Sequence, residues 1–234
     1  NSSFIDGEAG SGSGGGLYIY LRWSDTLSLH ITDSLFRHNS AGINGGNLFI
    51  QADATGGSAL VEDSVFTGGM TAAGEGGNIY AFSTDEEEPL LLTIHRSEIS
   101  EGTAGYDTNA ELGGGIYTGV PLALEDVTVS GNSAHVGGGI YATGETSDST
   151  FNNITLVYNT HDGNNLGAGI YKGGIGSIQF QNSIVAFNNQ ASSCSGHTCD
   201  CYTGGADIST GNNLEHGDAC GFNYSNTNPL RGPL

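Results

Sequence analysis

The chain has 234 residues, of which 40 are glycine, and its 25 acidic residues outnumber five basic ones, giving a formal net charge of −20. That charge repels phosphate backbones and anionic lipid, so nucleic acid is excluded as an expected partner. The glycines form short clusters without the every-third-residue pattern of collagen, and no apolar run is long enough to span a bilayer.

A short motif of alternating polar and apolar residues recurs seven times along the chain. Each copy ends in an apolar residue, and a Gly or Asn that we call the corner residue follows three positions later. The apolar residues are Phe4, Phe36, Phe66, Ile99, Val129, Leu156 and Val185, and the corner residues are Gly7, Asn39, Gly69, Gly102, Asn132, Asn159 and Asn188. We expect the apolar residues to form one internal column. We also expect Asn39, Asn132, Asn159 and Asn188 to form a corner ladder whose amides satisfy backbone groups and bond to their copies one coil away.

A glycine-rich phrase follows the corner in six copies, at residues 14–18, 45–49, 76–80, 113–117, 137–141 and 167–171. Its copies begin 24 to 37 residues apart, which is typical of a solenoid. Because side chains alternate along a strand, an inward aliphatic residue puts the next residue outside. The phrase therefore predicts an outer aromatic ladder of Tyr18, Phe49, Tyr80, Tyr117, Tyr141 and Tyr171.

A third alternating stretch completes each cycle, as at residues 27–31, 90–94, 122–124 and 175–180. Three short segments of period two, with no helical periodicity between them, predict an all-β parallel β-helix with three strands in each of about seven coils. We assign residues 1–190 to these repeats. The repeat pattern ends there, and residues 191–234 are expected to form a loop-rich C-terminal cap or junction segment packed on the last coil.

The C-terminal segment contains all four cysteines, Cys194, Cys199, Cys201 and Cys220. With His197 they could be interpreted as a zinc site, but paired C-x-x-C knuckles are missing. An even cysteine count favours disulfides, and four cysteines allow three connectivities.

Ser34-Leu35-Phe36-Arg37-His38-Asn39, followed by the phrase at residues 45–49, resembles the F-x-x-N and G-G-A/G-I repeats of polymorphic outer-membrane proteins and related bacterial surface proteins. The tail is similar to the end of such helices, with a cysteine loop, Gly211-Asn212-Asn213-Leu214, Cys220-Gly221-Phe222 and a Pro-Leu-x-Gly-Pro-Leu ending. The resemblance implies a right-handed β-helix, an extracellular or cell-surface location and a fragment of a longer chain. It also implies the disulfides Cys201–Cys220 and Cys194–Cys199.

Metal and catalytic sites are less well supported. Asp33, Asp63 and Asp126 recur at one corner and could bind calcium, but Arg96, Asn153 and Asn182 interrupt the series, so we interpret these aspartates as turn residues and expect no cofactor. A hydrolase needs converging carboxylates. The scattered candidates Asp25, Asp107, Glu111, Asp162 and the run at 86–88 share no phase, so no catalytic residue is expected.

These patterns predict a non-catalytic extracellular structural protein that self-associates as a surface or filament subunit. The first repeat begins at Asn1 with no capping segment before it, and an open strand edge of that kind invites strand addition by another subunit. The alternatives are a carbohydrate-active enzyme, a polysaccharide lyase or hydrolase, and a monomeric adhesin that binds host glycan or protein. A homo-oligomer is therefore the expected partner, with carbohydrate as the other candidate.

Overall fold

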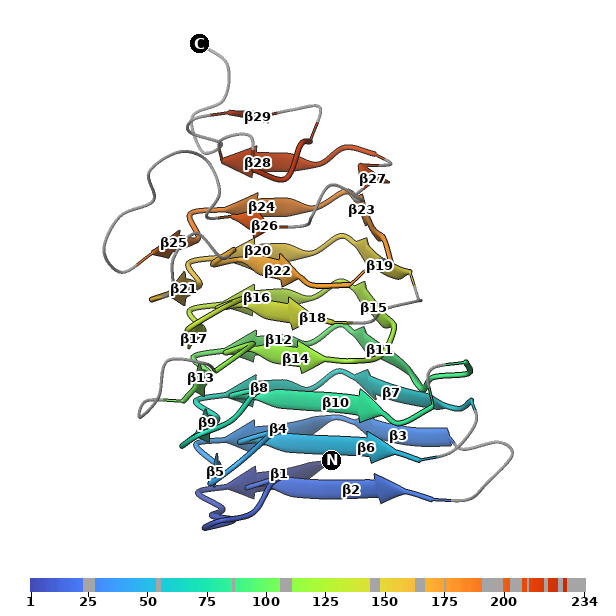
Figure 1. Cartoon of the computed structure of the whole chain (residues 1–234), viewed down its shortest axis with the longest axis vertical. Coiled ribbons are helices and arrows are strands. Elements are labelled where there is room, and N and C mark those ends of the chain that lie inside the picture. Colours follow the sequence, from blue (N-terminus) through green and yellow to red (C-terminus); the bar gives the residue numbers. More distant parts are fainter. Residues whose placement is uncertain are drawn as a thin grey trace.

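The computed structural model describes residues 1–22, 28–53, 56–85, 87–105, 111–143, 148–162, 167–174, 176–190, 200–202, 208–209, 211–216, 219–222 and 225–226. Every regular element among these residues is a strand, and strands of successive repeats pair in parallel. They build a right-handed β-solenoid of about six turns, with the N-terminus at one end and the C-terminal strands at the other (Figure 1). The predicted fold class is confirmed. No helix able to cross a membrane occurs in this described part of the chain.

Three sheets form the long faces of the solenoid. Sheet A contains β1 (Ser2–Ile5), β4 (Ser34–Arg37), β8 (Val65–Thr67), β12 (Glu98–Ser100), β16 (Thr128–Ser130), β20 (Thr155–Val157), β24 (Ile184–Ala186), β28 (Leu214–His216) and β29 (Ser225–Asn226). Sheet C contains β2 (Leu17–Leu21), β6 (Leu48–Ala52), β10 (Ile79–Ser83), β14 (Ile116–Thr118), β18 (Ile140–Ala142), β22 (Ile170–Lys172) and β26 (Cys201–Tyr202). Sheet D contains β3 (Ser28–Thr32), β7 (Ser58–Glu62), β11 (Leu91–His95), β15 (Leu122–Glu125), β19 (Ser149–Asn152), β23 (Ile178–Gln181) and β27 (Ile208–Ser209).

A fourth sheet, not expected from the sequence, lies between sheets A and C. Sheet B contains the two-residue strands β5 (Ser40–Ala41), β9 (Met70–Thr71), β13 (Thr103–Ala104), β17 (Ser133–Ala134), β21 (Thr160–His161) and β25 (Asn189–Gln190). The prediction of three strands per coil was therefore too low. Two residues are too few to show alternation in a sequence, and these strands are recognisable only because their partners in the next coil pair with them.

Parallel pairing in register turns repeated residues into columns. Phe36 pairs with Phe66, and further along Val129 pairs with Leu156 and Leu156 with Val185. The column begins at Phe4, which is half-buried, and its members from Phe36 to Val185 are fully buried. Burying an aliphatic or aromatic side chain contributes about 1.5–3 kcal/mol, so these columns are the main source of stability.

The glycine-rich phrase forms the corner before each strand of sheet C. Gly113 has a φ of 68°, and a Cβ there would lie 2.3 Å from the carbonyl oxygen of Ile116. Any side chain at this position would clash with the backbone of its own turn. The glycines of this phrase are therefore required by the backbone conformation of the turn, and the turn determines where each strand of sheet C begins.

The segment after residue 190 extends the solenoid by strand pairing. β26 joins sheet C, β27 joins sheet D and β28 joins sheet A, each beside the last strand of the preceding coil. Cys201 and Cys220 form a disulfide between β26 and the residues after β28. This pairing agrees with one of the two that the family resemblance implied. Cys194 and Cys199 lie outside the described residues.

Candidate functional site

The outer aromatic ladder is a continuous stack along sheet C. Its six predicted members lie in order, with neighbouring ring centroids 4.7 to 5.6 Å apart and ring planes within 7° of parallel. A seventh ring, Tyr202, stacks on Tyr171 at 4.9 Å. Sequence reasoning missed Tyr202 because no Gly-Gly-Gly precedes it. Its position 31 residues after Tyr171 matches the period of the repeat and could have identified it.

Each ring inside the ladder is stacked on both of its faces. Phe49 is 5 % exposed, and the tyrosines from Tyr80 to Tyr171 are half-buried, so they present only their edges to solvent. Burial raises the pKa of Tyr141 to about 12, which keeps this phenol protonated. Tyr18 and Tyr202, the two end rings, are 52 % and 41 % exposed. A sugar or another ring can therefore stack only at the ends of the ladder, since a stacking partner needs a free face.

A buried chain of side-chain amides runs parallel to this ladder. It passes from Asn39 through Asn47, Asn78, Asn132 and Asn159 to Asn188, with N···O distances of 2.6 to 3.1 Å between successive side chains. Each amide also donates to a backbone carbonyl of the preceding or following coil and accepts a backbone N–H. All six side chains are almost fully buried, and their hydrogen-bonding groups are satisfied.

Asn47 and Asn78 were not expected in this chain, because they belong to the glycine-rich phrase. They fill the space at corners where the next coil has glycine, at Gly69 and Gly102, whose Cβ positions would lie 2.7 and 2.5 Å from an Asn78 side-chain atom. Where the corner residue is asparagine, as at Asn159, the preceding phrase has glycine instead, here Gly139. In each such pair of positions, one in the glycine-rich phrase and one at the next corner, one residue is asparagine and supplies the amide, while the other is glycine.

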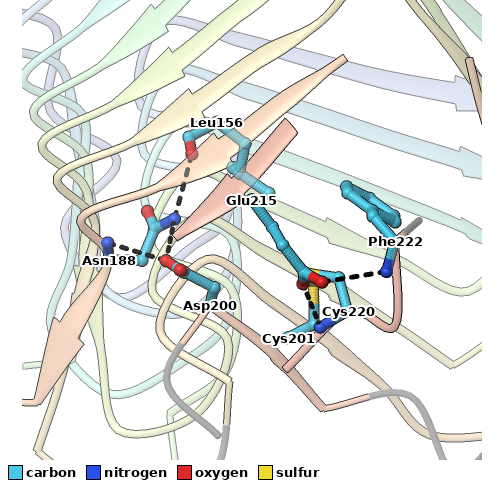
Figure 2. The surroundings of a disulfide bond; sticks show 7 residues. All are labelled: Leu156, Asn188, Asp200, Cys201, Glu215, Cys220 and Phe222. Carbon is cyan, nitrogen blue, oxygen red and sulfur yellow. Dashed lines mark hydrogen bonds between the residues drawn. A yellow bond between two sulfur atoms is a disulfide. The ribbon is translucent and has the colours of Figure 1, made fainter. Parts of the chain in front are cut away.

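The amide chain ends on a carboxyl group beside the disulfide (Figure 2). The backbone N–H and the side-chain amide of Asn188 both donate to Asp200 Oδ1, at 2.9 and 2.8 Å. Asp200 is 3 % exposed, and burial raises its pKa to about 6 despite the hydrogen bonds from Asn188. The next residue is Cys201, so the disulfide secures the strand that carries this carboxyl group.

A second buried carboxyl group occupies the internal apolar column. Glu215 pairs with Val185, is fully buried, and accepts the backbone N–H groups of Cys220 and Phe222 at 2.7 and 2.9 Å (Figure 2). Sequence patterning could not identify it, because the residues around it follow no repeat. Glu215 fixes the turn that brings Cys220 to Cys201.

The turn between sheets D and A carries the acidic residues that were weighed as calcium ligands. Asp33, Asp63, Arg96, Asp126, Asn153 and Asn182 occupy equivalent positions, all with positive φ. Arg96 makes a two-pronged contact with Asp63, at 2.7 and 2.6 Å, and reaches Glu62 at 2.8 Å. A shallow groove here is lined by Asp63, Ser64, Val65, Arg96, Ser97, Glu98 and Asp126.

The chemistry of this corner is that of a charge-paired surface. Arg96 Nη1 lies 2.7 Å from His95 Nδ1 and 3.3 Å from His95 Nε2, and because a guanidinium can only donate, the imidazole ring is the acceptor. His95 Nε2 also lies 3.8 Å from a carboxylate oxygen of Glu125 and 3.5 Å from one of Asp126. The positive charge of the adjacent Arg96 guanidinium disfavours a cation between His95, Glu125 and Asp126, although their ligand atoms lie within 4.8 Å of one another. Hydrogen bonds from Arg96 lower the pKa of Asp63, which suits an ion pair and not a general acid.

One pair of acidic residues lies close enough to interact near the tyrosines. Burial raises the pKa of half-buried Glu75, and the charge of Glu111 raises it further. Glu111 is 3 % exposed. Glu75 in turn raises the pKa of Tyr117 and Tyr141, after burial and other neighbours. Of the scattered candidate acids that lie in the described part of the chain, Glu111 is the one shown to interact with the carboxyl group of Glu75. Asp162 instead contacts His135 at 2.8 Å, while Asp25, Asp107, Glu86 and His197 lie outside the described residues.

Comparison of the chain with protein-family models, with curated proteins and with solved structures found no match.

Proposed function

We propose that this protein is a non-catalytic extracellular structural element that associates end to end with further copies through its β-solenoid ends. The observation that carries the proposal is the aromatic ladder. It runs along sheet C from β2 to β26, and no ring among the described residues stacks on the outer faces of its end members, Tyr18 and Tyr202, which are 52 % and 41 % exposed. A second copy placed on the axis would continue the stack.

Other features of the N-terminal end support this proposal. β1, β2 and β3 each form the outer edge of their sheets in the described structure, so one side of each strand carries no strand partner. Ile5 is 41 % exposed, and Phe4, Leu17 and Ile19 are only partly buried. An open edge with partly buried apolar side chains favours addition of another β-coil. The disulfide, typical of oxidising compartments, supports an extracellular location, as does the resemblance to bacterial surface repeats.

The proposal is tested by sedimentation velocity over a wide concentration range, with negative-stain electron microscopy of the same samples. We expect the mean mass to rise with concentration and rods to lengthen along one axis. Tyr18→Asp, which places a charge on the free ring face, should abolish this growth. Met70→Asp, at a site on the side of the rod that is 41 % exposed against 52 % for Tyr18, is the control. Monomers at all concentrations, or growth that survives Tyr18→Asp, would reject end-to-end assembly.

Glu75 and Glu111 favour a second candidate, a carbohydrate hydrolase. A hydrolase needs one carboxyl group with a raised pKa and a second carboxylate nearby, and Glu75 beside Glu111 meets the first requirement. The measurement is release of reducing ends from a panel of oligosaccharides. Activity that disappears in Glu75→Gln while the melting temperature is unchanged would establish this function over the structural one.

A further inference from the structure

A row of residues directly after the strands of sheet A forms a second outer ladder with one missing member. The row consists of Asp6, His38, Gly68, Glu101, Gly131, Tyr158 and Phe187, all with φ between 54° and 66°. Backbone hydrogen bonds link the residues from Asp6 to Gly131 to the next coil, as from Glu101 N to Ser130 O and from Gly131 N to Val157 O. Successive members therefore lie one strand spacing apart, about 4.8 Å. Positive φ is costly for bulky residues, so Tyr158 and Phe187 are unusual here.

Tyr158 has one covered and one open face. Its ring stacks on Phe187, with centroids 5.6 Å apart and planes 11° from parallel. The opposite face is turned toward the preceding coil, where the equivalent residue is Gly131 and has no side chain. Tyr158 is 58 % exposed, more than any other large hydrophobic residue described.

The space above Gly131 is open. Among the described residues outside its own turn, a Cβ built there would have only Glu101 within 4 Å, at 3.9 Å from its backbone N and 4.0 Å from its Cγ. The other glycine of the row, Gly68, differs, because the His38 ring would lie 2.3 Å from its Cβ and fills that space. We call the open space at Gly131 the slot. Tyr158 bounds it on one side and Glu101 on the other, and these two residues lie two strand spacings apart, about 9.6 Å. A planar group at the height of Gly131 would stack on Tyr158 at the spacing of the outer aromatic ladder.

The charge around the slot selects the kind of planar group. Glu98 and Glu101 are exposed, and neither forms a salt bridge with a described residue. Their hydrogen bonds come from neutral hydroxyl groups, from Ser100 to Glu98 at 2.8 Å and from Thr67 to Glu101 at 3.5 Å. The formal net charge of −20 adds a field that attracts cations. The slot therefore combines an aromatic face, a carboxylate opposite it and a negative surrounding potential.

We propose that Tyr158, Gly131 and Glu101 form a subsite for the guanidinium group of an arginine side chain on a basic protein partner. Guanidinium is flat and stacks on aromatic faces, and its donors match a carboxylate. A lysine ammonium carries the same charge but lacks the plane. A neutral pyranose can stack, and its hydroxyl groups can donate to Glu101, but it gains nothing from the net charge of −20.

The experiment compares hexa-arginine with hexa-lysine, two peptides of equal charge, by isothermal titration calorimetry at several salt concentrations. Both bind through the net charge and weaken as salt rises. The wild-type protein should prefer hexa-arginine about two- to five-fold, the range expected for a solvent-exposed cation–π contact. Tyr158→Ala should remove this preference, and Glu101→Gln should reduce it.

Two further variants make the result decisive. Gly131→Asn tolerates the positive φ, leaves Tyr158 in place and fills the slot, so it should also remove the preference, even if Tyr158→Ala fails to fold. His38→Ala, in the same row but away from the slot, should leave the preference unchanged. Equal affinity for both peptides in the wild type, or an arginine preference that persists in Gly131→Asn, would overturn the proposal. Displacement of hexa-arginine by a neutral oligosaccharide would overturn it in favour of a sugar subsite.

Discussion

Buried polar side chains give this solenoid its register at the scale of single residues. Apolar columns alone tolerate a slip of two residues, because the side-chain period of a strand is two. A chain of six amides, each bonded to its neighbours in space, has no such alternative register, because a slip would leave buried donors and acceptors without partners. The amide chain therefore specifies the fold more sharply than the hydrophobic core does.

Asp200 makes the stability of the last coil dependent on pH. Its pKa is about 6 in the folded protein against 3.8 ordinarily, so between these values the folded state binds more protons than the unfolded state. Stability is therefore highest below about pH 4 with respect to this group, and falls as pH rises to 6. Two pKa units correspond to about 3 kcal/mol.

Asp200→Asn should remove this dependence, because an asparagine oxygen accepts the same two bonds from Asn188 without a charge. We expect the variant to be more stable than wild type above pH 6 and similar to it near pH 4, measured by urea unfolding across this range. Asp148→Asn is the control with the opposite sign, since hydrogen bonds from Ser177 lower the pKa of Asp148. A wild-type curve that rises between pH 4 and 6, unaltered in Asp200→Asn, would contradict the assignment.

At the scale of repeated elements, asparagine stands either in the glycine-rich phrase or at the following corner, and glycine stands at the other position. This pattern predicts that two substitutions that swap the residues should compensate each other. Asn159→Gly removes a buried amide that bonds to Asn132, Asn188 and Val129 O, and should cost about 2–4 kcal/mol. Gly139→Asn alone should also destabilise, because its Cβ would lie 2.9 Å from Asn159 Cγ.

The double variant Asn159→Gly/Gly139→Asn copies the natural arrangement of Asn78 and Gly102. Its loss of stability in chemical unfolding should be smaller than the sum of the two single losses by more than about 1 kcal/mol. Recovery should be incomplete, since a Cβ at residue 139 also lies 2.5 Å from Gly169 O. Strict additivity would show that the two positions do not share one amide.

The disulfide should act on one coil and not on the whole solenoid. In a repeat protein each coil contacts only its neighbours, and the Cys201–Cys220 bridge closes a segment of 19 residues at one end. Reduction should cost about 3 kcal/mol locally. Hydrogen exchange should accelerate in β26 and β28 while β6 and β10 keep their protection. Uniform loss of protection along the chain would show that the solenoid unfolds as one unit.

At the scale of the whole molecule, the sequence predicted the longer recurring strands, and missed both the two-residue strands of sheet B and the features that occur once. The spacing of the glycine-rich phrases predicted parallel coils and the six-ring order of the ladder, because one period repeats in register. Glu215 in the apolar column and the end of the amide chain at Asp200 follow residue 190, where no glycine-rich phrase marks the phase. Tyr202 lies there too, and only its spacing of 31 residues from Tyr171 could have identified it. The slot at Gly131 needed coordinates, since a glycine in a sequence does not reveal that its neighbours leave the space empty.

End-to-end growth makes a prediction that no lateral contact shares. The two ends of the solenoid differ, so the contact is heterologous and can propagate without limit. Tyr18→Asp blocks one end, and Tyr202→Asp blocks the other. Each variant alone should remain monomeric, since every contact needs one intact end of each kind. A mixture should form 1:1 dimers and nothing longer, because Tyr202 of the first variant can still meet Tyr18 of the second. Sedimentation of the mixture separates the cases: monomers would place the contact elsewhere, and polymers would show that neither ring is required.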